Sequence, residues 1–141
     1  MQLCSRREYC RKEIFEKALS WGCSPAKANE LVNELVKQNY IDERRYTEAY
    51  TKDKLRFNKW GRIKISYMLR SQKIDSSIIA AVLSEIDETE YNKTLFDELQ
   101  KKYRGLKGSL PEIKLKLFRF ASSRGFEPDI VHNSIFQLLR K

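Results

Sequence analysis

The feature that most constrains this chain is an internal repeat with a period of about 50 residues. Cys23, Ile74 and Phe126 mark the same point in its three copies. At five fixed distances along the chain from that point, all three copies carry an apolar residue. The two positions before the point and the three positions after it are each spaced as on one face of a helix. The matching sets are Ile14, Ile65 and Leu117; Ala18, Leu69 and Ala121; Ala28, Ile79 and Val131; Val32, Leu83 and Ile135; and Leu35, Ile86 and Leu138. Each copy is therefore predicted to contain a pair of amphipathic helices.

A further helix leads the second and third copies. Ile41-Asp42-Glu43 followed by Tyr46 returns as Ile86-Asp87-Glu88 followed by Tyr91. In the first copy only residues 1–5 precede the first predicted helix, so we expect just two helices there. The sequence predicts an all-α fold of tandem three-helix repeats, bundles related to the helix-turn-helix, stacked into an elongated, curved array. The expected repeats are residues 1–41, 42–86 and 87–141.

Capping residues and helix breakers give the expected helix limits. The predicted helices cover residues 6–20, 25–38, 42–57, 62–71, a segment opening at Asp75, 87–104, and a segment opening at Pro111. The residues placed at helix caps are Ser24, Asp42, Asp75, Asp87 and Glu127. Tyr46, Ala49, Tyr50, Asp53 and Phe57 recur at helical spacing after Asp42. Residues predicted to face inward include Leu19, Leu95, Phe96, Leu99 and Tyr103.

The charge of the chain indicates its first candidate partner. The 141 residues have a formal net charge of +9 and a sequence pI near 9.5. Such a balance favours a polyanion, with nucleic acid ahead of a membrane surface. No apolar run approaches the roughly 18 residues of a membrane-spanning helix, and no secretion signal opens the chain. We therefore expect a soluble, cytoplasmic protein.

The basic residues gather in two blocks. Between Glu43 and Lys73 ten basic residues stand against three acidic ones, and between Lys101 and Arg124 eight stand against one. A single lysine on a small helix usually only solvates an outer face, but a dense field with interleaved aromatic residues suits a polyanion. For Trp60 and Tyr67 two interpretations stay open, stacking on a partner or packing in the core. The predicted binding residues are Lys52, Lys54, Arg56, Lys59, Trp60, Arg62, Lys64, Tyr67, Arg70, Lys101, Lys102, Arg104, Lys114, Lys116 and Arg119.

The sequence contains no constellation typical of catalysis or metal binding. It has no Gly-x-x-x-x-Gly-Lys loop, no His-x-x-x-His pair, no Gly-x-Ser-x-Gly elbow and a single histidine, His132. Cys4, Cys10 and Cys23 are odd in number and form no Cys-x-x-Cys pair, so we interpret them as reduced thiols. We expect no enzymatic activity, no cofactor and no metal.

Several segments together resemble the RecX family of recombinase regulators. They are YIDERRY at 40–46, KWGRI at 59–63, residues 69–74, Arg124-Gly125-Phe126 followed by Ile130, and SRREY at 5–9 with Leu19 and Gly22. Their order and spacing are more specific than any one segment, and they cover nearly the whole chain. Lys73 departs from the pattern, because the family is expected to have glycine there, and this leaves the geometry of that turn open.

The resemblance implies a negative regulator of the RecA recombinase that binds in the groove of the RecA filament on single-stranded DNA. It would limit filament extension, ATP hydrolysis, strand exchange and co-protease activity, and so modulate DNA repair, recombination and the SOS response. We expect a monomer, with duplex DNA as a further ligand. One alternative is a general DNA-binding helical repeat module without a recombinase partner, and another is a scaffold whose basic face only keeps it soluble.

Overall fold

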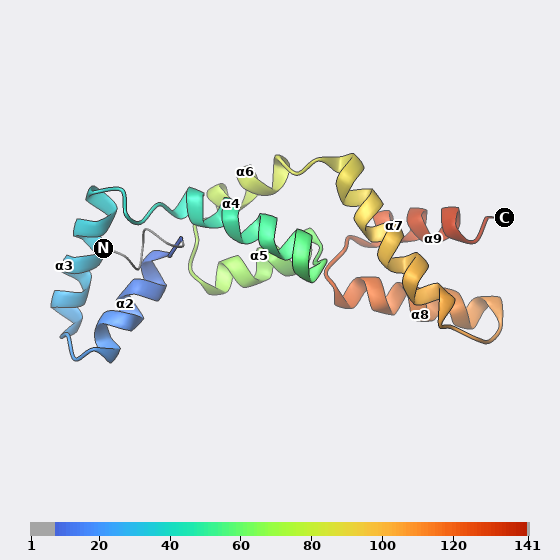
Figure 1. The fold of residues 1–141 in the computed structure, drawn as a ribbon, viewed down its shortest axis with the longest axis horizontal. Helices are drawn as coiled ribbons and strands as arrows, with labels where there is room; N and C mark the ends of the chain where they lie inside the picture. The colour runs from blue at the N-terminus through green and yellow to red at the C-terminus, as the bar shows by residue number, and fades with distance from the viewer. Residues whose placement is uncertain (1–7, 141) are drawn as a thin grey trace. The chain divides into compact units, whose positions relative to one another are not determined.

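The computed structural model describes residues 8–140, and every regular element among them is a helix (Figure 1). The predicted all-α fold is confirmed for this part of the chain. Residues 6 and 7, where the sequence predicts the first helix to begin, lie outside the described residues. The elements are α2 (Arg11–Ser20), α3 (Pro25–Lys37), α4 (Glu43–Asp53), the π-helix η1 (Lys54–Asn58), α5 (Arg62–Ser71), α6 (Ser76–Ser84), α7 (Glu88–Arg104), α8 (Leu110–Ser123) and α9 (Pro128–Leu138).

The chain forms two compact units, and each unit combines segments that are separated in the sequence. The first joins the residues up to Lys52 with Met68–Ser84, and the second joins Asp53–Tyr67 with the residues from Glu85 onwards. This division follows packing, so the limits of the three repeats stay a prediction. The core of the first unit contains Tyr9, Ile14, Val32, Leu35 and Ile41. In the second unit α7, α8 and α9 pack around Tyr91, Leu95, Leu99, Leu117, Ala121, Phe126, Val131, Ile135 and Leu138.

One backbone turn recurs in all three copies of the repeat. Gly22, Lys73 and Gly125 occupy the same position of each copy, and their φ angles are positive, at 93°, 61° and 89°. In each copy the next residue donates its N–H to the carbonyl five positions earlier, which closes the end of the preceding helix. The bonds run from Cys23 to Ala18 at 3.1 Å, from Ile74 to Leu69 at 3.2 Å and from Phe126 to Ala121 at 3.2 Å. The backbone therefore confirms the register that the apolar columns predict.

The second of these turns carries a lysine in a conformation that favours glycine, which yields a stability prediction. Lys73 has a φ of 61°, and the left-handed region costs a residue with a Cβ roughly 1–2 kcal/mol. Lys73→Gly is expected to raise the free energy of unfolding by about 0.5–1 kcal/mol, because the gain exceeds the added entropy of the unfolded chain. The measurement is the thermal midpoint by circular dichroism at 222 nm. Ser71→Gly, inside α5, is the control and should lower the midpoint; a lower midpoint for Lys73→Gly would contradict the argument.

Four of the five predicted helix caps are confirmed, and one of them is Asp42, whose side chain accepts the N–H of Arg45 at 3.0 Å. The side chains of Ser24, Asp75 and Asp87 accept hydrogen bonds from backbone N–H groups of the first helical turn. Glu127 also stands at an N-cap position, but its side chain caps nothing. Its carboxylate is instead used in the site described below. The cap donors and distances are Lys27 at 3.3 Å, Ser77 at 2.8 Å and Glu90 at 3.2 Å.

The helix expected over residues 42–57 changes type near its end. After α4 ends at Asp53, η1 forms a π-helical turn, and Trp60 donates its N–H to the carbonyl of Lys54 at 3.1 Å. A π-turn contains more residues than an α-turn, so the side chains after Asp53 point in other directions than an α-helix predicts. The α-helical spacing predicted from Tyr46 to Phe57 therefore ends at Asp53, and the side chain of Phe57 is 71% exposed. Leu55 packs against the core of the second unit instead.

Some other positions of the predicted helical stripes are also exposed to solvent. Ala49 is exposed, because the buried face of α4 passes through Tyr46, Thr47 and Thr51. Sequence analysis overlooked the two threonines as core residues, since a hydroxyl is polar; that of Thr47 is satisfied by the carbonyl of Glu43 at 2.7 Å. Leu19 and Tyr103 lie partly exposed in the last turns of their helices.

Further expectations concern thiols, metals and membranes. Cys10 is buried, and burial raises the pKa of its thiol to about 11, in line with an unreactive residue. Within residues 8–140 no three metal-binding side chains gather closely enough to hold an ion. No helix of that range is both long and apolar enough to cross a membrane.

Candidate nucleic-acid interface

The candidate site is built on a close approach of two backbone segments within the second unit. The N–H of Gly61 donates to the carbonyl of Arg124 at 2.7 Å, and that of Ile63 donates to the carbonyl of Gly125 at 3.0 Å. A Cβ on Gly61 would lie 2.4 Å from the carbonyl oxygen of Gly125. A Cβ on Gly125 would lie 2.3 Å from the Cβ of Lys64. Glycine is therefore required at both positions, and it joins the start of α5 to the turn between α8 and α9.

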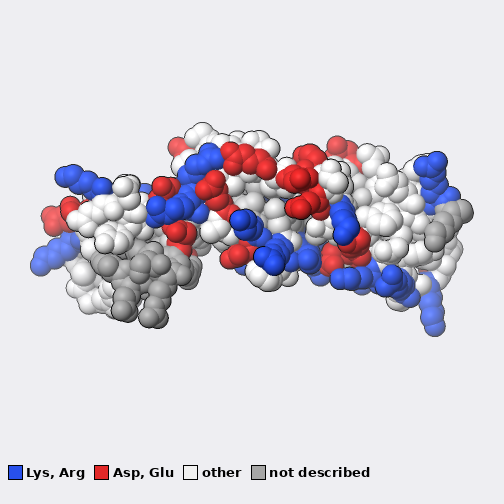
Figure 2. All heavy atoms as spheres, turned by 45° about the horizontal axis from the view of Figure 1, so that its top comes forward, with Lys and Arg blue, Asp and Glu red and all other residues white. Residues whose placement is uncertain are grey.

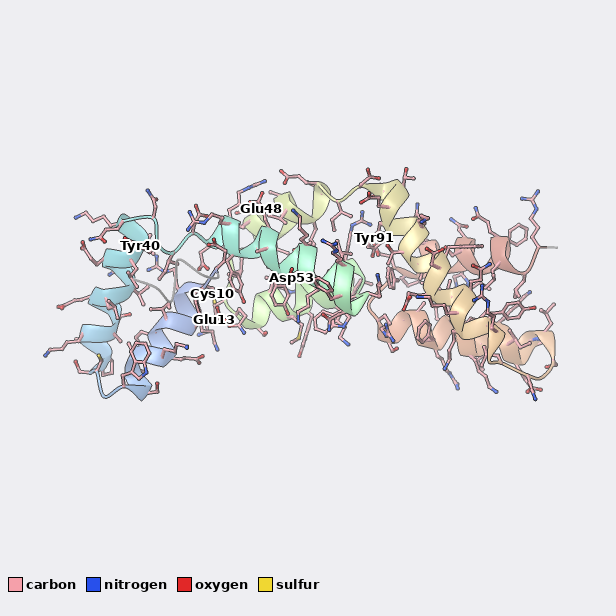
Figure 3. All side chains as sticks on the ribbon, viewed as in Figure 1. Cys10, Glu13, Tyr40, Glu48, Asp53 and Tyr91 are labelled. Carbon is pink, nitrogen blue, oxygen red and sulfur yellow. The ribbon has the colours of Figure 1, made fainter. Side chains whose placement is uncertain are left out.

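A polar network fixes the same junction through side chains. The guanidinium of Arg62 donates to the carboxylates of Glu127, at 2.8 Å, and Glu88, and it lies 4.1 Å from the ring centre of Tyr91. The hydroxyl of Tyr91, near the beginning of α7 (Figure 3), donates to Glu127 and accepts the backbone N–H of Arg62 at 2.9 Å. α5, α7 and the start of α9 are thereby joined around one half-buried guanidinium.

The surroundings of Tyr91 and Arg62 shift the pKa values of both groups and so fix their protonation states. Burial, together with the hydrogen bond to Glu127, raises the pKa of Tyr91 well above its ordinary value, so the phenol stays neutral. Burial opposes the charge on Arg62, but the hydrogen bond and charge of Glu127 outweigh it, and the pKa of Arg62 is raised. Arg62 therefore remains a cation, and its side chain is only 17% exposed.

Trp60 follows η1 and lies between two lysines. The Nζ of Lys54 is 4.9 Å from the centre of its ring, and the Nζ of Lys64 is 4.6 Å away. Both distances are typical of cation–π contacts, which hold the ammonium groups beside an aromatic face. Trp60 therefore fits both interpretations in part, because its side chain is partly buried, as for core packing, and also lies beside two cations, as for a binding residue.

Three large apolar side chains of the same segment are open to solvent. Phe57 is 71% exposed, Ile63 50% and Tyr67 65%, and the guanidinium of Arg56 lies 5.5 Å from the ring centre of Phe57. For Tyr67 core packing is thereby excluded within the second unit. Exposed aromatic rings beside cations are typical of surfaces that bind single-stranded nucleic acid. We name as the basic-aromatic surface the residues Lys54, Arg56, Phe57, Lys59, Trp60, Ile63, Lys64 and Tyr67.

The second basic block lies on α7 and α8, and its residues differ in how far they are engaged. Lys101 forms an ion pair with Glu98 at 3.4 Å, and Lys102 lies 5.6 Å from the ring centre of Phe120. The remaining predicted binding residues of this block are exposed, and within residues 8–140 none of them forms an ion pair. They are Arg104, Lys114, Lys116 and Arg119.

The structure brings together only part of the predicted set. Lys54, Arg56, Lys59, Trp60, Arg62, Lys64 and Tyr67 stand on one continuous segment of the second unit, whereas Lys52 and Arg70 belong to the first unit. Figure 2 shows that basic side chains project at many places on the face in view, with acidic ones among them. The net charge is therefore not one uniform field, and local clusters matter more than the total.

Several residues of the candidate site are absent from the predicted binding set. Phe57 and Ile63 were not included among the binding residues, Tyr91 was noted only for its place in the repeat, and Glu127 was predicted only as a cap. One signal was present in the sequence: Gly61 and Gly125 each stand beside an arginine at a helix boundary. Their proximity in space has no sequence signature.

By fold, the chain is a tandem array of three-helix domains. The family model described as RecX, second three-helix domain, matches residues 42–83, and the one described as RecX, third three-helix domain, matches residues 88–134. A regulatory protein RecX of Neisseria meningitidis is 30% identical over 96% of this chain and 85% of its own length. The chain belongs to the RecX family of regulatory proteins.

Relatives differ in length. The regulatory protein RecX of Clostridium perfringens is 32% identical over 90% of this chain, but the match covers 60% of that protein. The crystal structure of RecX from Lactobacillus salivarius superposes with a TM-score of 0.81 at 21% identity, covering 97% of this chain and 90% of that one. This likeness supports the fold.

Proposed function

We propose that this chain regulates the RecA recombinase by binding the RecA filament on single-stranded DNA. The observation that carries the proposal is the basic-aromatic surface, in a member of a family of regulatory proteins. A single strand presents phosphates to cations and unstacked bases to aromatic rings, and this surface offers both groups within one short segment. The proposed action takes place in the cytoplasm, with the protein as a monomer.

The proposal gives the binding residues two roles. Lys54, Arg56, Lys59 and Lys64 supply charge to phosphates, and Phe57 and Tyr67 supply faces for bases. Arg62 acts as a positioning residue, since two carboxylates already occupy its guanidinium. The exposed cations of α7 and α8 extend the contact along the filament. The bound protein then limits filament extension, ATP hydrolysis, strand exchange and co-protease activity.

The experiment that tests the proposal measures ATP hydrolysis by a preformed RecA filament on single-stranded DNA. This protein is added at less than one copy per recombinase subunit, and a steep fall of the rate at low ratios is expected. A variant with Lys27→Gln and Lys37→Gln, two exposed charges on α3, should inhibit as strongly as the natural chain. An unchanged rate, with DNA binding intact, would instead favour a general DNA-binding module.

A further inference from the structure

The helical hairpin of α8 and α9 carries an exposed apolar surface of its own. Phe118 stacks on His132 across the hairpin, with 4.7 Å between the ring centres. α8 and α9 run antiparallel (Figure 1), so Leu115 and Phe136, each about one turn further along its helix from this pair, come side by side. Leu115 is 49% exposed and Phe136 is 68% exposed. We name Leu115, Phe118, His132 and Phe136 the hairpin surface.

The rings of the hairpin surface belong to the third copy of the repeat alone. The second copy has small side chains at the same distances from its reference residue, Ile74. They are Ser66, Ala80 and Ser84, in place of Phe118, His132 and Phe136. α5 and α6 form with these small residues, so a helix pair of this repeat does not require aromatic rings there.

The charged residues at the edge of the hairpin surface are mostly basic. Lys114, Arg119 and Arg140 each stand within four positions of one of its members, and all three are exposed. Within residues 8–140 none of the three forms an ion pair. The acidic residues of α8 and α9 are Glu112 and Asp129, each in the first turn of its helix. The surface is thus apolar at its centre and positive at its edge, which is complementary to an apolar surface with an acidic edge.

These features select among possible occupants. A second copy of this chain would bring the same cations together, and each copy has a net charge of +9, so self-association is disfavoured. A DNA strand requires open ring faces, whereas Phe118 and His132 already cover each other. Two antiparallel helices can accept a further helix along their seam, because helix ridges pack into grooves. The complementary occupant is an amphipathic helix with acidic flanks.

We propose that the hairpin surface binds an acidic, amphipathic helix of the RecA recombinase. Apolar side chains of that helix bury Leu115 and Phe136. Its carboxylates pair with Lys114, Arg119 and Arg140. The choice of RecA as the partner rests on the proposed function. On this basis the cations beside the hairpin surface contact protein and those of the basic-aromatic surface contact DNA, so recombinase and strand are bound at separate sites.

The test combines Leu115→Gln and Phe136→Gln in one chain. Binding is measured to RecA protein without DNA and, separately, to a single-stranded oligonucleotide. Removing two large apolar side chains from a buried contact is expected to weaken RecA binding about 100-fold and to leave oligonucleotide binding unchanged. Trp21→Gln is the matched control, because Trp21 is 63% exposed, and it should bind RecA as the natural chain does.

A second variant tests the charges at the edge of the surface. With Lys114→Gln, Arg119→Gln and Arg140→Gln, binding to RecA without DNA should weaken roughly 10-fold at low salt, because three ion pairs are lost. The remaining affinity should also depend less on salt than that of the natural chain. Equal affinity and equal salt dependence would refute an acidic partner helix.

The possible failures are distinguishable. Equal RecA binding by the natural chain and the double variant would overturn the hairpin proposal and leave the proposed function standing. Weaker oligonucleotide binding by the double variant would assign the surface to DNA, and loss of binding to phosphatidylglycerol vesicles would assign it to a lipid surface. Either result overturns a protein partner. If the natural chain binds neither RecA nor its filament, the recombinase is excluded and the proposed function fails as well.

Discussion

Gly125→Ala is expected to destabilise the second compact unit by about 3 kcal/mol. Two costs combine at this position. The φ of 89° strains any residue with a Cβ, and the new methyl group would lie 2.3 Å from the Cβ of Lys64 and 2.5 Å from its backbone nitrogen. The second contact involves backbone, which cannot rotate away, so the hydrogen bonds at Gly61 and Ile63 must also weaken. The expected result is a lower urea midpoint for the second unit.

Two other glycines separate the costs. Gly22 has a φ of 93° but no atom within 4 Å of an added Cβ, so Gly22→Ala should cost only the strain, about 1 kcal/mol. Gly61 has no positive φ, but its Cβ would lie 2.4 Å from Gly125, so Gly61→Ala should show the steric cost alone. If Gly125→Ala and Gly22→Ala prove equally destabilising, the close approach of the two segments is refuted.

The two tryptophans allow the units to be followed separately. Trp21 belongs to the first unit and Trp60 to the second. In a Trp21→Phe background the fluorescence of Trp60 reports the second unit, and its two lysine neighbours make it sensitive to unfolding. This measurement therefore assigns each loss of stability to one unit, which a signal averaged over all helices would not do.

Removing four positive charges from the basic-aromatic surface should weaken DNA binding more than removing four positive charges elsewhere on the chain. A chain with Lys54→Gln, Arg56→Gln, Lys59→Gln and Lys64→Gln is expected to bind a single-stranded oligonucleotide at least about 100-fold more weakly at low salt. The slope of log affinity against log salt should fall by about 0.7 for each lost phosphate contact. The measurement is a titration repeated at several salt concentrations.

The matched control removes the same charge elsewhere. Lys12, Lys17, Lys27 and Lys37 lie on α2 and α3, and changing all four to glutamine lowers the net charge equally. This control should keep most of the salt slope, because only local cations release counterions from bound phosphates. Equal losses in the two variants would show that total charge matters and that the surface has no special role.

The helix pairs could be predicted because their cause is local. Ile65, Leu69, Leu117 and Ala121 are all fully buried, as the apolar columns require. The helix end at Gly22 could be predicted for the same reason, whereas the geometry of the turn at Lys73 stayed open because lysine stands where the family pattern has glycine. Information within about ten residues was sufficient for these features.

The candidate site could be predicted only in part, because its geometry depends on residues that are distant in the sequence. Glu127 is 65 positions from Arg62, so its carboxylate was interpreted as a cap. Tyr67 stands between Ile65 and Leu69, and helical periodicity alone cannot say whether such a flanking residue is buried. The π-turn that exposes Phe57 depends on Leu55 meeting a core formed mostly by α7, α8 and α9. These features require tertiary contacts.

The way the two units share the chain has a consequence for its synthesis on the ribosome. The first unit needs Met68–Ser84, so it can be completed only after those residues have emerged. The segment with the basic-aromatic surface emerges earlier, yet Glu127, the partner of Arg62, is made 65 residues after that arginine. Because chains grow from the N-terminus, this segment stays without its partners until the turn before α9 has emerged, and the surface becomes ordered only then.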